Sequence, residues 1–260
     1  MRCGTGGTPA GSLVDGRVLD VEAVGSALRM LLARSEVTTE RALIAASDAV
    51  ATFRVLSLPK AARNAEIETA VAREFPLDPE RMSIRWYDVP FDGDERRIYV
   101  VAWDRGLVRN ITSAVRHAGL EPGAVDLKSA CLARAVPEPS CILVDLSSDP
   151  AEIVLVDGRM PQVWSTFRPN VAPGGDVSPA LVAPLKSVLR YYKRRRDTNF
   201  APASPVLIST EQPLPHSSLS RLEQAVDYPV THMPMPPRVP PEIRHATFLT
   251  CIGLIMRRTE

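Results

Sequence analysis

Residues 141–168 constrain the fold of this chain more than any other stretch, because three apolar runs there are separated by two turn signals. The signals are Ser-Ser-Asp-Pro and Asp-Gly-Arg, which are typical of tight connections between strands. The pattern predicts a three-stranded antiparallel meander. Asp145 lies where the first strand enters its turn, and in some nucleotide-binding folds that position faces a phosphate or its magnesium ion. The stretch is therefore either a phosphate-holding hairpin or only a hairpin.

The chain has 260 residues, of which 45% are apolar and 23% are charged, and its net charge is +1. These values describe a globular protein of one large or two small domains, without an electrostatic basis for a nucleic-acid partner. The four cysteines form no CxxC pair, which favours a reducing compartment. The apolar run ATFLTCIGLIM is shorter than the roughly 20 residues of a membrane span. We therefore expect a cytoplasmic protein without a transmembrane span.

Two parts of the chain have a clear internal organisation. Residues 1–16 are rich in Gly, Thr and Ser, and we expect them to be flexible. Residues 41–120 show the order strand, strand, helix twice, which predicts an α+β unit with one four-stranded sheet and helices on one face. Its first helix has an apolar stripe, and Asp104 is the expected N-cap of the second. The stripe consists of Ile67, Val71 and Phe75. The last helix, expected over 242–258, is apolar almost all round and should be buried.

Several segments resemble the type IV pilus assembly PilM family, whose members are relatives of the cell-division protein FtsA and of actin. The longest is ALIAASDAVATFRVLSLPKAARNAEIETAVAREFPLDPE, with its R-x-L-x-L-P strand end at Arg54–Pro59. Others are AGLEPGAVDLKSACLARA, the hairpin CILVDLSSDPAEIVLVDGR, FRPNVAPGG, SVLRYYKRRR and HATFLTCIGLIMR. They occur in family order between about residue 15 and residue 257.

The resemblance implies an α/β, actin-like and ribonuclease H-like fold with two lobes. Residues 17–138 would form the first lobe, with 41–120 as a subdomain inserted into it. Residues 139–240 would form the second lobe, which the meander opens. The segment 241–260 would be a C-terminal helix that packs back between or onto the lobes.

The resemblance also places a phosphate site, and the sequence departs from it in four ways. The first phosphate hairpin should lie before residue 15, and the second should read Asp-x-Gly where this chain has Asp145-Leu146-Ser147. The adenosine loop lacks its glycines, and the small subdomain between Gly175 and Tyr191 is missing. We therefore expect no ATP hydrolysis, no bound ATP or magnesium, and at most a vestigial nucleotide site. Its residues would be Asp145, Ser147, Ser148, Gly174 and Gly175.

Other chemistry has little support in the sequence. The four histidines show no i, i+4 pair, and no cysteine stands at ligand spacing from another. We therefore expect no metal site, and no nucleophile-elbow motif indicates a catalytic residue. The run Lys193–Arg196 is the sharpest charge feature. It is either a solvated helix end that suits the helix dipole or a contact for anionic lipid headgroups.

In the PilM family, a short cytoplasmic segment of the single-span membrane protein PilN binds in a groove of the first lobe. Here the FRVLSLP segment and the sheet around Trp86, Tyr87 and Trp103 are candidates for such a surface, although each tryptophan is also explained as core. We therefore expect a non-catalytic adaptor of a pilus, competence or secretion machine, peripheral to the inner membrane and bound to a PilN-like partner. The alternatives are an ATP-binding actin-like switch and a GspL-like cytoplasmic domain of a type II secretion system.

Overall fold

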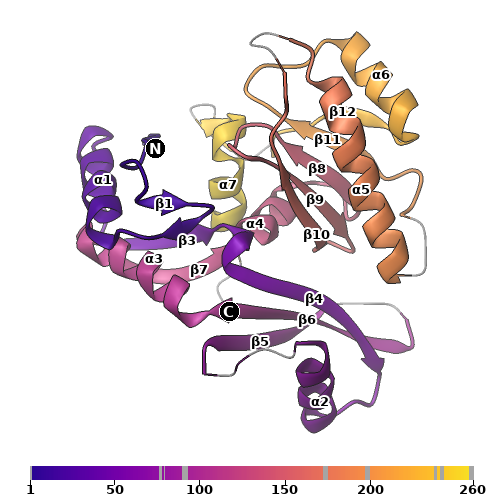
Figure 1. Ribbon diagram of the computed structural model, residues 1–260, viewed down its shortest axis with the longest axis horizontal. Helices are drawn as coiled ribbons and strands as arrows, with labels where there is room; N and C mark the ends of the chain where they lie inside the picture. Colours follow the sequence, from indigo (N-terminus) through magenta and orange to yellow (C-terminus); the bar gives the residue numbers. More distant parts are fainter. Residues whose placement is uncertain are drawn as a thin grey trace. The chain divides into compact units, whose positions relative to one another are not determined.

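The computed structural model describes residues 2–75, 78, 80–89, 93–171, 175–196, 200–236, 239–240 and 243–257. The chain divides into two compact units, Met1–Lys128 and Ser129–Glu260 (Figure 1). Each unit has its own buried apolar clusters, so each is described by itself. Within the described part of the chain, no helix combines the length and the hydropathy that a membrane span needs.

The first unit contains three separate sheets and three α-helices among its described residues. In chain order its elements are β1 (Leu13–Val14), β2 (Arg17–Val18), α1 (Val21–Arg34), β3 (Arg41–Ala46), η1 (Asp48–Val50), β4 (Ala51–Pro59), α2 (Asn64–Glu74), β5 (Met82–Val89), β6 (Glu95–Asp104), α3 (Arg105–His117) and β7 (Glu121–Leu127). A small hairpin, β1–β2, precedes α1 as a further strand pair. The expected helices and strands of 41–120 are therefore present, although they are paired differently from the prediction.

The prediction of one four-stranded sheet over 41–120 is wrong. Strands β4, β6 and β5 form an antiparallel three-stranded sheet, while β3 pairs in parallel with β7. The single 3-10 turn η1 separates β3 from β4 and lets the two strands join different sheets. A parallel partner for β3 requires a crossover, and α3 provides the last part of it before β7. Helix α3 consequently packs against α1 rather than beside α2.

Helix α2 covers one face of the β4–β6–β5 sheet (Figure 1). Its predicted stripe of Ile67, Val71 and Phe75 is buried, at 0%, 6% and 4% exposure. These side chains pack against alternate residues of the central strand, Ile98 and Val100. The alternation places the odd-numbered side chains of β6 on the other face of the sheet. Helix α2 therefore covers one face of the sheet, and the odd-numbered side chains of β6 lie on the other face.

The second unit is built on a five-stranded mixed sheet with the order β10-β9-β8-β11-β12. Strands β8, β9 and β10 form the predicted antiparallel meander, and β8, β11 and β12 run parallel. This order is that of a ribonuclease H-like sheet. In chain order the elements are α4 (Lys128–Ala135), β8 (Cys141–Asp145), β9 (Ala151–Asp157), β10 (Met160–Phe167), α5 (Ser178–Arg196), β11 (Val206–Ser209), α6 (His216–Val226), β12 (Val230–His232), η3 (Ala246–Phe248) and α7 (Leu249–Ile255).

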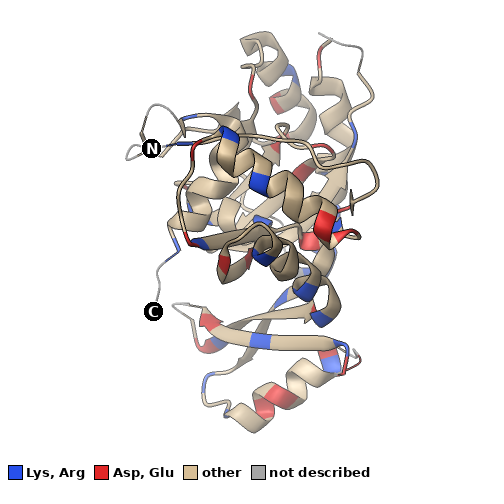
Figure 2. Cartoon of the chain, turned by 90° about the vertical axis from the view of Figure 1, so that its left-hand side faces the viewer, with Lys and Arg blue, Asp and Glu red and all other residues tan. Residues whose placement is uncertain are grey.

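Helices cover both faces of this sheet. Helices α5 and α6 pack on the face of Ile142 and Val144, and α4 and α7 pack on the face of Cys141 and Leu143 (Figure 1). Every residue of β8 is therefore buried, which explains its unbroken apolar run. Figure 2 shows acidic and basic residues scattered over the chain, in keeping with its small net charge.

The last helix is shorter than the predicted 242–258. It consists of α7 with the preceding turn η3, and His245 before them is in extended conformation. An apolar run without a clear period gives no signal for where a helix begins. Gly253 of α7 lies against α4 so closely that a β-carbon at this position would lie 1.8 Å from the carbonyl oxygen of Cys131. The two helices thus meet through their backbones.

Candidate functional site

The hairpin between β8 and β9 is closed by the carboxylate of Asp145. This side chain is 2% exposed. It accepts hydrogen bonds from the amide of Ser147 at 3.1 Å, from the hydroxyl of Ser147 at 2.5 Å and from the hydroxyl of Ser148 at 2.9 Å. A turn capped by its own first residue is a common local structure. Three of the five residues predicted for the vestigial site are thus brought together, with Asp145 as acceptor for both serines.

Two further polar side chains lie beside Asp145 on the same face of the sheet. In register with Asp145 are Glu152 on β9 and Ser209 on β11. They are 6% and 1% exposed, and in the described structure the hydroxyl of Ser209 has no hydrogen-bond partner. Glu152 could not be identified from the sequence, because its position opposite Asp145 depends on the register of β8 and β9. We call Asp145, Glu152 and Ser209 the polar edge of the sheet.

The polar edge does not fit the phosphate of a nucleotide. Phosphate cradles use free backbone amides, usually beside glycine. Here the amide of Ser147 already donates to Asp145, and the side chain of Ser147 occupies the position that a glycine would leave open. Glu152 adds a second carboxylate directly opposite Asp145. Both features oppose the approach of an anion. Within the described residues no group of three or more His, Cys, Asp or Glu side chains forms a metal site.

The glycine pair predicted for the site lies before α5. Gly174 lies outside the described residues, and Gly175 is exposed. The amide and the hydroxyl of Ser178 donate to the carboxylate of Asp176 at 3.0 Å and 2.8 Å, and the Arg221 guanidinium lies 2.5 Å from the same carboxylate. These contacts lower the pKa of Asp176, the amide of Ser178 having the largest effect. Helix α5 begins directly after this lead-in, so no subdomain stands between Gly175 and Tyr191.

A groove of about 400 Å³ lies in the first unit, where β5 and β6 meet the start of α3. We call it the Trp103 groove. Trp103 contributes its indole and Val108 an aliphatic side chain, while Arg105 and Arg109 are exposed cations. The groove is lined by Ser83, Trp103, Arg105, Val108, Arg109 and Thr112. An apolar floor flanked by guanidinium groups suits a segment that presents an apolar side chain next to a carboxylate or carbonyl oxygen.

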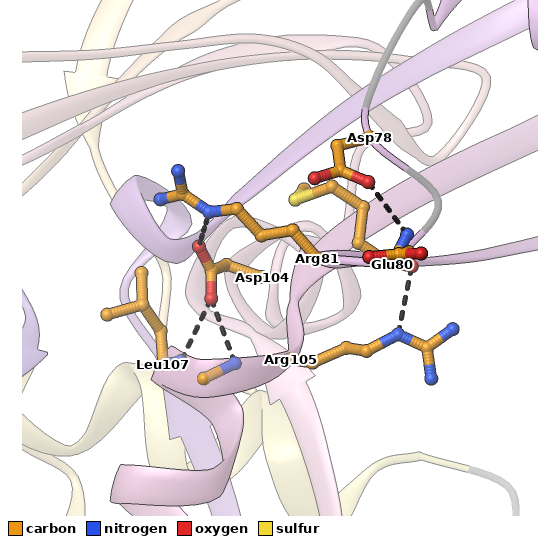
Figure 3. A network of polar contacts seen from close by, with 8 residues as sticks. Asp78, Glu80, Arg81, Asp104, Arg105 and Leu107 are labelled. Atoms are coloured by element: carbon orange, nitrogen blue, oxygen red, sulfur yellow. Dashed lines mark hydrogen bonds and ion pairs between the residues drawn. The ribbon is translucent and has the colours of Figure 1, made fainter.

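Asp104 holds this junction together (Figure 3). As the predicted N-cap of α3, its carboxylate accepts from the amides of Gly106 and Leu107 at 2.9 Å and 3.1 Å. Its other oxygen accepts from Arg81 at 2.8 Å, and Arg105 donates to the carbonyl of Met82 at 3.0 Å. The strand β5 and the helix α3 are thereby tied to each other on one side of the groove.

The balance of these contacts lowers the pKa of Asp104. Burial taken alone would raise it, but the hydrogen bonds from Arg81, Leu107 and Gly106 outweigh burial. Because the pKa of Asp104 is lowered in the folded state, its ionised carboxylate stabilises the fold at pH values above its ordinary pKa of about 3.9. This stabilisation is lost as the pH falls through the pKa of the folded state.

Replacing Asp104 by alanine should therefore lower the free energy of unfolding at neutral pH by about 1–2 kcal/mol. The difference between wild type and Asp104→Ala should shrink as the pH falls below about 4. Urea unfolding over a pH series measures both effects. Asp94→Ala, which removes an exposed carboxylate between β5 and β6, is the matched control. A difference that stays constant down to pH 2 would contradict the assignment.

Of the three aromatic residues suggested as a partner surface, the structure places one in this groove. Trp86 packs on the opposite face of the sheet with the α2 cluster, where its ring lies 5.9 Å from the guanidinium carbon of Arg96. Tyr87 is 49% exposed and lies against Tyr99, with ring centroids 5.4 Å apart. Only Trp103 lines the groove. The groove could not be identified from the sequence, because Ser83 and α3 come together only in the folded unit.

No protein-family model matches the sequence, and no curated protein is similar to it. Solved structures do resemble the fold. A chain of a PilM-PilN type IV pilus biogenesis complex has 20% identity and a TM-score of 0.68, and the match covers 95% of this chain and 88% of that one. The cytoplasmic domain of EpsL, an inner membrane component of the type II secretion system of Vibrio cholerae, has 11% identity and a TM-score of 0.52. That match covers 90% of this chain and 82% of the other.

At these low sequence identities, the structural similarity shows a shared fold. Together with the sheet order of the second unit, they confirm the α/β, actin-like fold that the resemblance to the PilM family implied. The likeness extends over nearly the whole of this chain and most of the compared chains, so it covers both units and not one common motif.

Proposed function

We propose that this chain is a non-catalytic cytoplasmic adaptor of a type IV pilus or related secretion machine. It would bind a short cytoplasmic segment of a single-span, PilN-like inner-membrane protein and be held at the membrane by that partner. The observation that carries the proposal is the fold shared with a chain of the PilM-PilN complex over 95% of this chain. The likeness to the EpsL cytoplasmic domain supports the same class of machine and keeps the GspL-like alternative in view.

The Trp103 groove is the proposed binding surface for the partner. It combines an indole, an aliphatic side chain and two exposed guanidinium groups in a recess of about 400 Å³. Strand β5 lies beside the groove and is an edge strand of the β4–β6–β5 sheet. An extended peptide can form backbone hydrogen bonds with such an edge strand. Side-chain specificity would then come from the groove and backbone affinity from β5.

An affinity pull-down from detergent-solubilised membranes of the source organism tests the adaptor role. We expect the tagged protein to recover a single-span protein with a short cytoplasmic N-terminal segment. Arg109→Glu reverses an exposed charge in the groove and should reduce recovery about tenfold, equivalent to about 1.4 kcal/mol. Arg116→Glu makes the same change further along α3, outside the groove, and should leave recovery unchanged. Recovery of soluble enzymes alone, or of nothing above background, would refute the adaptor role.

An ATP-binding switch is the second candidate, because Asp145, Ser147 and Ser148 lie together at the hairpin where the resemblance places a phosphate. Calorimetry with Mg·ATP separates the two proposals. We expect no saturable heat, because the amide of Ser147 is already bonded to Asp145 and Glu152 opposes the phosphate charge. Micromolar binding that is lost in Asp145→Ala would overturn the expectation that the nucleotide site is only vestigial and would favour the ATP-binding switch. Asp126→Ala, which removes a carboxylate from the first unit, is the control.

A further inference from the structure

Helix α5 has an unusual charge distribution. Its sequence, SPALVAPLKSVLRYYKRRR, contains six Lys and Arg residues and no Asp or Glu. Four of these residues stand at i, i+4, i+7 and i+8, which places them on one side of a helix. We call Lys186, Arg190, Lys193 and Arg194 the basic face of α5. All four are exposed.

The basic face lies opposite the side that anchors the helix. Leu181, Leu185, Val188 and Tyr192 are buried between α5 and the sheet. In the described part of the chain, no hydrogen bond or ion pair involves any of the four cations. The chain as a whole has a net charge of only +1, so the acidic residues that balance the six cations of α5 lie on other elements.

The helix dipole accounts for only part of this pattern. It favours cations within the last turn, where Lys193 and Arg194 lie close to the end. Lys186 and Arg190 stand further back in the helix, beyond the reach of that effect. Lys193 and Arg194 of the run seen in the sequence are thus the end of a longer cationic face. The side chain of Arg196 lies outside the described residues.

The same side of α5 has apolar surface between its charges. A shallow groove of about 530 Å³ is lined by Pro179, Val182, Ala183, Lys186, Leu189 and Arg190. Val182 and Leu189 are half-buried, and Ala183 is exposed. A surface that alternates cations with small and branched apolar side chains matches the headgroup region of a bilayer, where anionic groups lie next to acyl chains. Nucleic acid would use the cations alone.

We propose that the basic face of α5 binds directly to the anionic headgroups of a lipid bilayer. The contact is separate from the Trp103 groove, because it lies in the other unit and on a single helix. It gives the protein an attachment to the membrane of its own, in addition to any membrane-bound partner. Four cations near an anionic surface provide a weak, salt-sensitive contact that adds to the affinity of a second binding site.

Vesicle flotation with the purified full chain tests this proposal. The probes are vesicles of equal parts phosphatidylglycerol and phosphatidylethanolamine, and vesicles of phosphatidylcholine alone. We expect binding to the anionic vesicles only, and less binding at high salt. Lys186→Gln with Arg190→Gln should lower the partition coefficient by roughly 25-fold, since each cation near the surface contributes about fivefold. The matched control, Lys60→Gln with Arg116→Gln, removes two exposed cations from the first unit.

Absence of binding, equal binding to phosphatidylcholine vesicles, or equal losses in the two double variants would each overturn the proposal. Tighter binding to a DNA duplex than to anionic vesicles at the same ionic strength would assign the face to nucleic acid and overturn it as well. The assay contains no protein partner, so its failure leaves the proposed adaptor function standing. A failed pull-down likewise leaves the lipid contact standing.

Discussion

Gly253→Ala is expected to lower the free energy of unfolding of the second unit by about 3 kcal/mol or more. The added β-carbon would lie 1.8 Å from the carbonyl oxygen and 2.5 Å from the carbonyl carbon of Cys131. Both atoms belong to the backbone of α4, so no side chain can rotate away, and α7 must move away from α4. Helix propensity alone predicts the opposite sign, because alanine is the better helix former by about 1 kcal/mol.

Denaturant unfolding followed by circular dichroism measures this effect. Ile255→Ala is the matched control, since this residue lies in the same helix and is 61% exposed. We expect the control to stay within about 0.5 kcal/mol of wild type. A Gly253→Ala protein as stable as wild type would show that α7 does not pack against α4 through its backbone.

Trp103→Ala is expected to weaken binding of the proposed partner segment by at least about 30-fold, or about 2 kcal/mol. Aromatic side chains in recessed positions dominate binding energy, and Trp103 is the largest side chain in the groove. Fluorescence titration with a synthetic peptide of the recovered partner's cytoplasmic segment measures the affinity. Trp103 also packs against the core of α1 and α3, so folding of the variant must be checked by circular dichroism at the titration temperature.

Trp86→Ala provides the matched control for this prediction. It removes the same side chain from the same sheet, but on the face that α2 covers. If binding takes place in the Trp103 groove, Trp86→Ala should leave the affinity within about twofold of wild type. Equal losses in both variants would place the partner elsewhere or show a general loss of stability. Arg109→Glu then decides between these two, because it changes an exposed charge without touching the core.

Features that depend on neighbouring residues could be predicted from the sequence. The meander followed from apolar runs and turn signals, the α2 stripe from i, i+4 spacing, and the cap at Asp104 from its position before an apolar-periodic segment. Each of these signals lies within a few residues of the structure that it specifies. The serines around Asp145 are of the same kind, since their hydrogen bonds link residues two and three positions apart.

Features that depend on distant residues were missed or mispredicted. The pairing of β3 with β7 joins segments about 80 residues apart, and nothing local distinguishes it from pairing with β4. Glu152 lies at the polar edge because of the register of β8 and β9, and a register shift of one residue would turn its side chain to the other face of the sheet. The Trp103 groove required β5 and α3 to meet. Of the basic face of α5, only Lys193 and Arg194 were identified in the sequence. Adjacent cations stand out in a sequence more than cations at helical spacing do.

The position of β8 at the centre of its sheet has a consequence for synthesis of the chain. On one side β8 pairs with β9, which follows it after a short turn, and on the other with β11, which follows only after β10 and α5. The meander can therefore close as soon as it leaves the ribosome, whereas the second edge of β8 stays unpaired until Ser209 has emerged. During that interval a strand that is apolar up to Asp145 presents open backbone groups, with which the strands of other nascent chains can pair.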